Sequence, residues 1–84
     1  MKYSDTLQII DYGSNQYLSY KGYYGSAEMS LKDEVLHGKI VNIQGLVTYE
    51  SDNVKGLINS FMEAVDDYID YCRKHNMPTY YDLA

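Results

Sequence analysis

The sequence predicts an α+β fold in which a small antiparallel sheet of three or four strands precedes one long helix packed on one of its faces. Polar and apolar residues alternate through 23–31 and again through 35–41, and a third short run follows at 46–50. Such alternation is typical of half-buried strands. From 53 to 75 the apolar residues recur every three or four positions, which is typical of an amphipathic helix. The order β-β-β-α therefore favours a helix laid over a sheet.

The first nineteen residues leave two interpretations open. They form either a strand at 6–12 followed, after the turn signal Gly13-Ser14-Asn15, by a second strand at 16–20, or a loosely held extension. We therefore divide the chain into an N-terminal extension, a main domain and a short C-terminal tail, at 1–19, 20–78 and 79–84.

A hairpin joins the two alternating runs, with its turn at Lys32-Asp33-Glu34. We predict that Glu28 pairs with Lys39 on the polar face, because opposite charges stabilise a cross-strand pair. His37 then lies on the same face, opposite Ser30. The same register forms three apolar pairs on the other face: Ala27 with Ile40, Met29 with Gly38, and Leu31 with Leu36.

The third strand at 46–50 leads directly into the helix, but its five residues do not decide which side faces inward. Asn53 is the expected N-cap, because its side-chain oxygen can accept from the free amides of the first turn. Arg73, Lys74 and His75 place positive charge at the last turn, where the helix dipole is negative. Asn76 suits a left-handed cap, and Pro78 cannot continue the helix.

The composition describes one small domain of 84 residues with a formal net charge of −5, one cysteine and eleven tyrosines. A single cysteine excludes an internal disulfide framework and suits the reducing cytoplasm. No apolar run approaches the roughly 20 residues of a membrane span, and the N-terminus lacks a signal-peptide core. The acidic balance repels phosphate backbones and attracts basic partners, and tyrosine is common at interfaces.

Clustered carboxylates are the strongest sign of possible catalysis, because two-metal nucleases use them. Here Glu63, Asp66, Asp67 and Asp70 lie on one stripe of one helix, and the sequence provides no converging ligand from a strand. Such a stripe is typical of a water-facing side. We therefore interpret the four acids as a solvated surface and expect no metal site.

Two other candidates for chemistry are also interpreted as structural. Cys72 and His75 have the spacing of two metal ligands, but no second pair exists and Cys72 falls on the apolar stripe, which favours a packed cysteine. His37 has no nucleophile or orienting acid placed beside it by the sequence. We expect neither a catalytic residue nor a cofactor.

One helix covers one face of the sheet, so the other face needs a different cover. That cover is the N-terminal segment, a second copy of the chain or a partner protein. The face is half apolar and carries two groups of side chains, Tyr24, Val41 and Ile43 beside Glu28, His37 and Lys39.

Four segments within 20–75 carry a family resemblance: YKGYYGSAE at 20–28, LHGKI at 36–40, GLVTYE at 45–50 and EAVDDY at 63–68. Together they resemble the HicB-like antitoxin family of bacterial toxin–antitoxin pairs. The resemblance implies a β-β-β-α domain, described as a partial ribonuclease-H-like fold. It also implies a role in masking a small, basic, mRNA-cleaving toxin of the HicA type.

The leading hypothesis is therefore a non-catalytic, cytoplasmic antitoxin-like protein. The acidic helix stripe of Glu63, Asp66, Asp67 and Asp70 steers a basic toxin, and the sheet supplies the contact through Tyr24 and Glu28. A homo-oligomer, most simply a dimer, is expected because so small a domain buries only a modest core.

Members of the HicB-like family usually continue into a DNA-binding segment, whereas this chain ends at Ala84, so direct DNA binding is not expected. Two alternatives remain open. The first is an oligomeric nucleic-acid-binding regulator without a toxin partner, which would bind duplex DNA with a steep dependence on salt. The second is a metal-dependent hydrolase, which would lose turnover when Asp66 or Asp70 becomes Asn.

Overall fold

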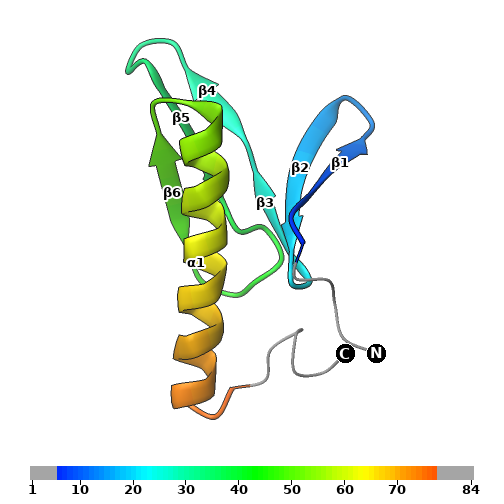
Figure 1. Ribbon diagram of the computed structural model, residues 1–84, viewed down its shortest axis with the longest axis vertical. Coiled ribbons are helices and arrows are strands. Elements are labelled where there is room, and N and C mark those ends of the chain that lie inside the picture. The colour runs from blue at the N-terminus through cyan, green and yellow to red at the C-terminus, as the bar shows by residue number, and fades with distance from the viewer. Residues whose placement is uncertain (1–5, 78–84) are drawn as a thin grey trace.

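A computed structural model describes residues 6–77, in which six short strands precede one long helix (Figure 1). The predicted α+β class and the order of strands before helix are confirmed. The strands form two three-stranded antiparallel sheets instead of one sheet. In chain order the elements are β1 (Gln8–Tyr12), β2 (Asn15–Tyr20), β3 (Tyr23–Ser26), β4 (Glu28–Ser30), β5 (Val35–Lys39), β6 (Thr48–Ser51) and α1 (Val54–Lys74).

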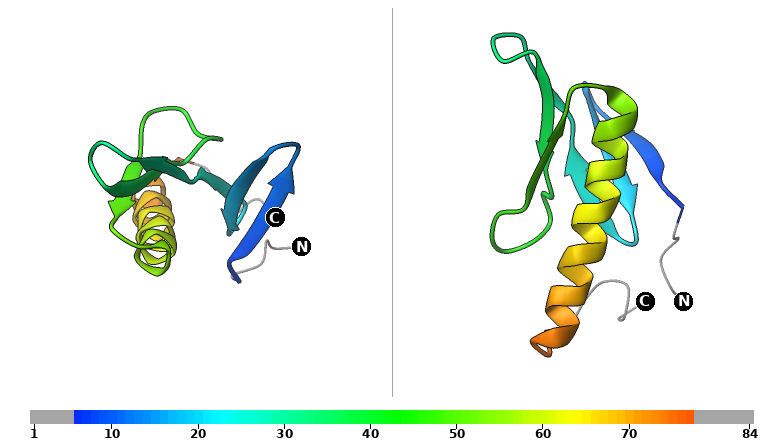
Figure 2. Two further views of the ribbon diagram at one scale, coloured as in Figure 1. Left: turned by 90° about the horizontal axis from the view of Figure 1, so that it is seen from above. Right: turned by 60° about the vertical axis from the view of Figure 1, so that its left-hand side comes forward.

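The two sheets, β1-β2-β3 and β4-β5-β6, meet where the predicted strand at 23–31 is interrupted at Ala27 (Figure 2). A bridge between Gly25 and Ile40 continues the register of β4 and β5 into β3. At the interruption the Lys39 amide donates to the Ser26 hydroxyl, 3.0 Å away, instead of to a backbone carbonyl. The two sheets therefore form one continuous, twisted surface. It bends at Ala27, next to the point where the Ser26 hydroxyl accepts the hydrogen bond of the Lys39 amide.

The register of the β4–β5 hairpin differs from the predicted one by two residues. Glu28 lies opposite His37, and Met29 lies opposite Leu36. The turn takes four residues, 31–34, because Glu34 adopts a left-handed conformation with φ 55°. A shift of two leaves every side chain on its predicted face, so the alternation of the sequence cannot distinguish these registers.

The predicted apolar pairs of this hairpin are therefore wrong. Ile40 lies opposite Gly25 instead of Ala27, and Leu31 belongs to the turn instead of pairing with Leu36. Met29 and Leu31 are 66% and 83% exposed. They stay in solvent because the helix packs mainly on β5 and β6 and leaves β4 at the rim.

The first strands form a hairpin, which is one of the two interpretations left open for the N-terminus. Gly13 opens its two-residue turn with φ 63°, which glycine adopts without strain. Lys21 and Gly22 both have positive φ in the next turn, as a type I′ hairpin requires. The predicted domain boundary at 19/20 falls inside β2, which pairs with β3. Residues 1–5 and the tail at 79–84 lie outside the described residues.

The helix is confirmed at both ends. The Asn53 side chain accepts from the Gly56 amide at 2.7 Å, and Asn76 adopts the predicted left-handed conformation with φ 56°. Its buried residues all belong to the predicted apolar stripe: Leu57, Phe61, Val65, Ile69 and Cys72. Ile58 and Tyr68 of the same stripe are partly buried, whereas Val54 at its start is 63% exposed. Pro78 lies outside the described residues.

The core lies between this stripe and the inner faces of the sheets, and its sheet members are Leu18, Tyr23, Ile40 and Tyr49. Full burial of each large apolar side chain contributes about 1.5–3 kcal/mol. β6 begins at Thr48, two residues later than predicted, and Leu46 stays 76% exposed in the preceding loop. Tyr49 is therefore the residue of β6 that faces the helix.

Tyr49 joins the two sheets to the helix. Its hydroxyl donates to the Ser26 carbonyl at 2.7 Å, and its ring lies 5.4 Å from the Phe61 ring between centroids. Gly25 and Gly38 make room for it, because a Cβ at either position would collide with the Tyr49 side chain. Burial raises the pKa of the Tyr49 hydroxyl.

Candidate functional site

The face of the sheets opposite α1, which we call the outer face, carries an apolar patch at its β1–β3 end. Cross-strand pairing places Ile10 beside Tyr17 and Ser19 beside Tyr24 on this face. Tyr12 is 76% exposed there. We define the tyrosine patch as the five residues that line an open hollow of about 400 Å³: Ile10, Tyr12, Tyr17, Tyr24 and Val41. Amphipathic tyrosines on a rigid sheet are suited to contact with a second macromolecule.

The β4–β6 end of the outer face is charged. Glu28, His37 and Glu50 form a row across three strands. His37 therefore lies opposite two glutamates, and the prediction that it lies opposite Ser30 is wrong. Between this row and the tyrosine patch lies a second hollow of about 720 Å³, whose lining includes Glu28 and Lys39. Tyr24 and Glu28 thus share one face, as the sequence predicted, whereas Ile43 packs against the core.

The four helix acids lie on the opposite side of the molecule. Glu63, Asp66, Asp67 and Asp70 are all exposed on α1, which covers the inner face of the sheets (Figure 2). The six residues predicted to bind a partner therefore form two surfaces, one on the outer face and one on the helix. This separation agrees with the sequence analysis, which placed Tyr24 and Glu28 on the sheet face that the helix does not cover.

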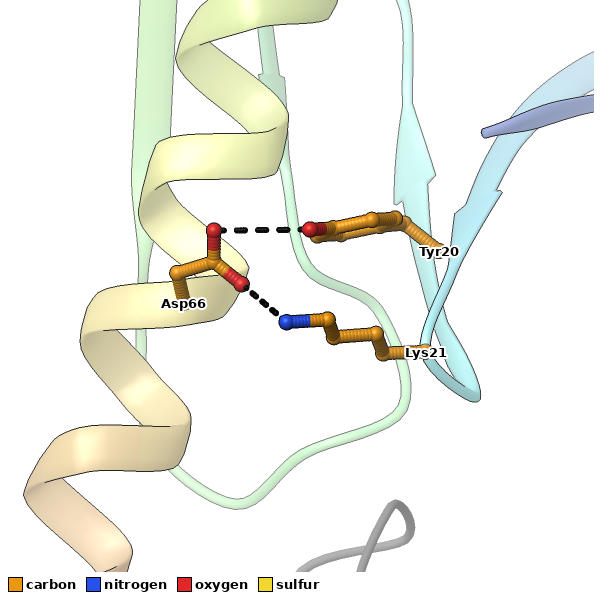
Figure 3. Close-up of polar contacts among 3 residues, drawn as sticks. All are labelled: Tyr20, Lys21 and Asp66. Carbon is orange, nitrogen blue, oxygen red and sulfur yellow. Dashed lines mark hydrogen bonds and ion pairs between the residues drawn. The ribbon is translucent and has the colours of Figure 1, made fainter. Parts of the chain in front are cut away.

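Asp66 is engaged within the chain (Figure 3). Its carboxylate accepts from the Lys21 ammonium at 2.9 Å and from the Tyr20 hydroxyl at 3.4 Å. The hydrogen bond to Asp66 raises the pKa of the Lys21 ammonium. Because Lys21 lies in the β2–β3 turn, this contact ties the N-terminal hairpin to the middle of α1. A separation of 45 residues hid it from any pattern in the sequence.

The remaining helix acids differ among themselves. Asp70 forms an exposed ion pair with Lys74 one turn later, at 3.2 Å. Asp67 lines a hollow of about 530 Å³ between α1 and the loop before β6, with Leu46, Tyr68 and Tyr71. Leu46 and Tyr71 are 76% and 51% exposed, so the groove presents exposed apolar side chains next to the Asp67 carboxylate. Leu46 and Tyr71 are candidate contact residues that the sequence reasoning missed, because loop and helix become neighbours only in the folded chain.

The residues considered for other chemistry occupy ordinary positions. Cys72 is fully buried, as predicted, while the His75 ring stacks on Tyr71. Among residues 6–77, no three His, Cys, Asp or Glu side chains are grouped closely enough to hold a metal ion. In the same part of the chain, no helix is both long enough and apolar enough to cross a membrane.

Comparison of the chain with protein-family models, with curated proteins and with solved structures found no match. Its two faces therefore have to be interpreted from their own geometry and charge.

Proposed function

We propose that the chain is an antitoxin-like binding protein that neutralises a small basic toxin of the HicA type by covering its RNA-binding surface. The HicB-like sequence pattern at 20–75 and the net charge of −5 both support this proposal. An enzyme that cleaves mRNA must attract phosphates with lysine and arginine. An acidic protein competes for those same groups, so inhibition requires binding alone and no bond-making step.

The groove beside Asp67 is the observation that carries the proposal. It places a carboxylate next to Leu46 and Tyr71, and Glu63 is exposed one turn earlier on the same helix. A basic partner is steered by the charges and held by the apolar contacts, which is the usual division of roles at an interface. Asp66 and Asp70 add less net charge, because each already has a cation beside it.

The outer face is the second candidate contact, with Tyr24 and Glu28 as the residues predicted from the sequence. It lies on the other side of the sheet from the groove, so one compact toxin is unable to cover both. Alanine at Tyr24 with lysine at Glu28 tests this face, and alanine at Leu46 with alanine at Tyr71 tests the groove. We expect the groove variant to dissociate faster from the toxin and the outer-face variant to dissociate at the wild-type rate.

The first prediction concerns the rate of association with the toxin. Glu63→Lys combined with Asp67→Lys should slow association roughly tenfold at low salt, and the difference should shrink as salt screens the charges. The partner to be tested is a small basic protein encoded by a reading frame adjacent to that of this chain, and stopped-flow or surface-based kinetics give the rate. Glu63→Gln with Asp67→Asn is the matched control, and its effect should be intermediate because it removes half as much charge.

Co-expression provides the functional arm of the test. The basic neighbour should arrest growth and cleave mRNA when expressed alone, and this chain should restore growth. An association rate that is unchanged in the double lysine variant would exclude steering by α1. Failure of the pair to bind, together with tight and salt-sensitive binding of this chain to duplex DNA, would instead favour the nucleic-acid-binding regulator.

A further inference from the structure

The outer edge of β1 is an unprotected strand edge. β1 ends the first sheet, and within the described residues no backbone hydrogen bond links its outer edge to another segment. Sheet edges are normally protected by proline, a bulge or charged side chains. The sequence Gln-Ile-Ile-Asp-Tyr has no proline, Asp11 is its one charged residue, and Ile9 is 60% exposed.

The pairing with β2 decides which backbone groups point outward. A two-residue turn makes Tyr12 and Asn15 a hydrogen-bonded pair, and such pairs alternate along an antiparallel ladder. Gln8, Ile10 and Tyr12 therefore direct their amides and carbonyls toward β2. Ile9 and Asp11 direct theirs away from the sheet, where they are available to another strand.

We propose that a second copy of this chain pairs its β1 antiparallel to this edge, about a two-fold axis at Ile10. The outward amide and carbonyl of Ile9 then form two hydrogen bonds with those of Asp11 in the second copy. Asp11 forms the same two bonds with Ile9 of the second copy, which gives four backbone hydrogen bonds. Ile10 faces Ile10 of the second copy at the close, non-hydrogen-bonded position on the outer face. The two tyrosine patches thereby become neighbours across a six-stranded sheet.

A second copy at this edge brings few charged side chains together. Each chain carries a net charge of −5, and the four helix acids lie on α1, which does not pair with β1. β1 has one charged residue, Asp11, whose carboxylate accepts from the Gln16 amide group at 2.9 Å. In the two-fold register Asp11 lies opposite Ile9 of the second copy, so like charges are not directly paired.

This arrangement goes beyond the proposed toxin binding and does not depend on it, because the β1 edge lies apart from the groove beside Asp67. The two kinds of binding differ in how they depend on salt concentration. Screening weakens the attraction between this acidic chain and a basic toxin, but it relieves the repulsion between two acidic copies. Self-association should therefore stay constant or strengthen with added sodium chloride.

Proline at residue 9 tests the pairing directly. Ile9→Pro removes an amide that β2 does not use, so the hairpin should be retained while the edge loses a donor. Ile9→Thr is the matched control, because it keeps the amide and the branched Cβ. Ile10→Lys acts independently of the backbone by placing two ammonium groups opposite each other at the axis.

Sedimentation equilibrium of the full chain, from micromolar to millimolar concentration, should give a dimer. Ile9→Pro and Ile10→Lys should each weaken the dimer at least about tenfold, whereas Ile9→Thr should leave it within about threefold. Hydrogen exchange should protect the Asp11 amide in the wild-type chain and expose it in Ile9→Pro, with the amides of Ile10 and Tyr12 protected in both. Far-UV circular dichroism verifies that each variant is folded.

Three results would overturn the proposal. One is a wild-type chain that remains monomeric at every concentration, whether its Asp11 amide exchanges freely or is covered by the chain's own terminal residues. Another is a dimer that persists unchanged in folded Ile9→Pro. The third is a dimer that dissociates as salt is added. If Ile9→Pro fails to fold, the response of Ile10→Lys decides between dimer and no dimer at this edge.

Discussion

At the scale of single residues, the junction of the two sheets depends on two glycines and one tyrosine. Gly38 lies so close to the Ser26 carbonyl that a Cβ there would overlap backbone, whereas the atoms nearest to a Cβ at Gly25 belong to the side chains of Tyr49 and Phe61. Side chains can move aside, but a paired strand has far less freedom to do so. The two glycines should therefore tolerate substitution unequally.

Gly38→Ala should destabilise the chain by about 3 kcal/mol or more, and Gly25→Ala by about 1–3 kcal/mol. Urea unfolding followed by circular dichroism measures both values. Adding Phe61→Leu to Gly25→Ala should recover part of the loss, because it frees space beside the new methyl group. The same addition to Gly38→Ala should recover nothing, and equal recovery in the two backgrounds would contradict the assignment of the clash to backbone.

At the scale of elements, the N-terminal hairpin is held to α1 by contacts of different strength. Leu18 and Tyr23 contribute buried apolar surface from the strands, and the Tyr23 ring meets the Tyr68 ring edge-on at 5.6 Å. The ion pair between Lys21 and Asp66 is half exposed, and such pairs contribute up to about 1 kcal/mol. It ties the β2–β3 turn to the middle of α1.

Asp66→Asn should therefore destabilise the chain by less than about 1 kcal/mol, yet it should increase hydrogen exchange in β1 and β2. Asp67→Asn is the matched control, because it removes the same charge from the next residue of the helix. Two-dimensional NMR of both variants resolves the hairpin amides individually. If the two variants exchange alike, the contact in Figure 3 does not restrain the hairpin.

At the scale of the whole molecule, stability should decrease in alkaline solution for two linked reasons. Burial raises the pKa of Tyr49, so the folded chain keeps a proton that the unfolded chain releases near pH 10. The hydrogen bond to Asp66 also raises the pKa of Lys21, so its effect on stability has the same sign. Both contributions are complete below the unfolded pKa values, and both are lost as the pH rises through the folded ones.

The free energy of unfolding should thus fall between pH 9 and pH 11. Tyr49→Phe should reduce that slope, because its ring no longer titrates, although the lost hydrogen bond to Ser26 costs about 1 kcal/mol at neutral pH. Urea titrations at intervals across this range give the slope for each protein. Parallel slopes for wild type and variant would show that Tyr49 titrates alike in the folded and unfolded chains.

The molecule also divides its surface by charge and polarity. The helix side presents acids beside the groove at Asp67, and the outer face presents the tyrosine patch beside a charged row. Under the two proposals, one chain binds a basic protein on one side while its β1 edge pairs with a second copy. The two proposals respond to salt in opposite directions, so a single ionic-strength series examines both.

Local patterns in the sequence were enough to determine the helix, its caps and its buried stripe, because their period and end signals lie within one element. They also determined the α+β class, and they placed Tyr24 and Glu28 on the uncovered face, because alternation assigns side chains to faces. The hairpin register was wrong by two residues, since every even shift satisfies the same alternation and the four-residue turn at 31–34 depends on the left-handed Glu34.

Only the tertiary structure decided which candidates lie together. It paired Asp66 with Lys21 and brought Leu46 beside Asp67 and Tyr71. These contacts join residues far apart in the chain, and they depend on how the sheet twists at Ala27 and on which face α1 covers. Sequence periodicity indicates which face of its own helix or strand a side chain lies on. It does not indicate the distance to a residue in another element, because that distance depends on how the elements pack.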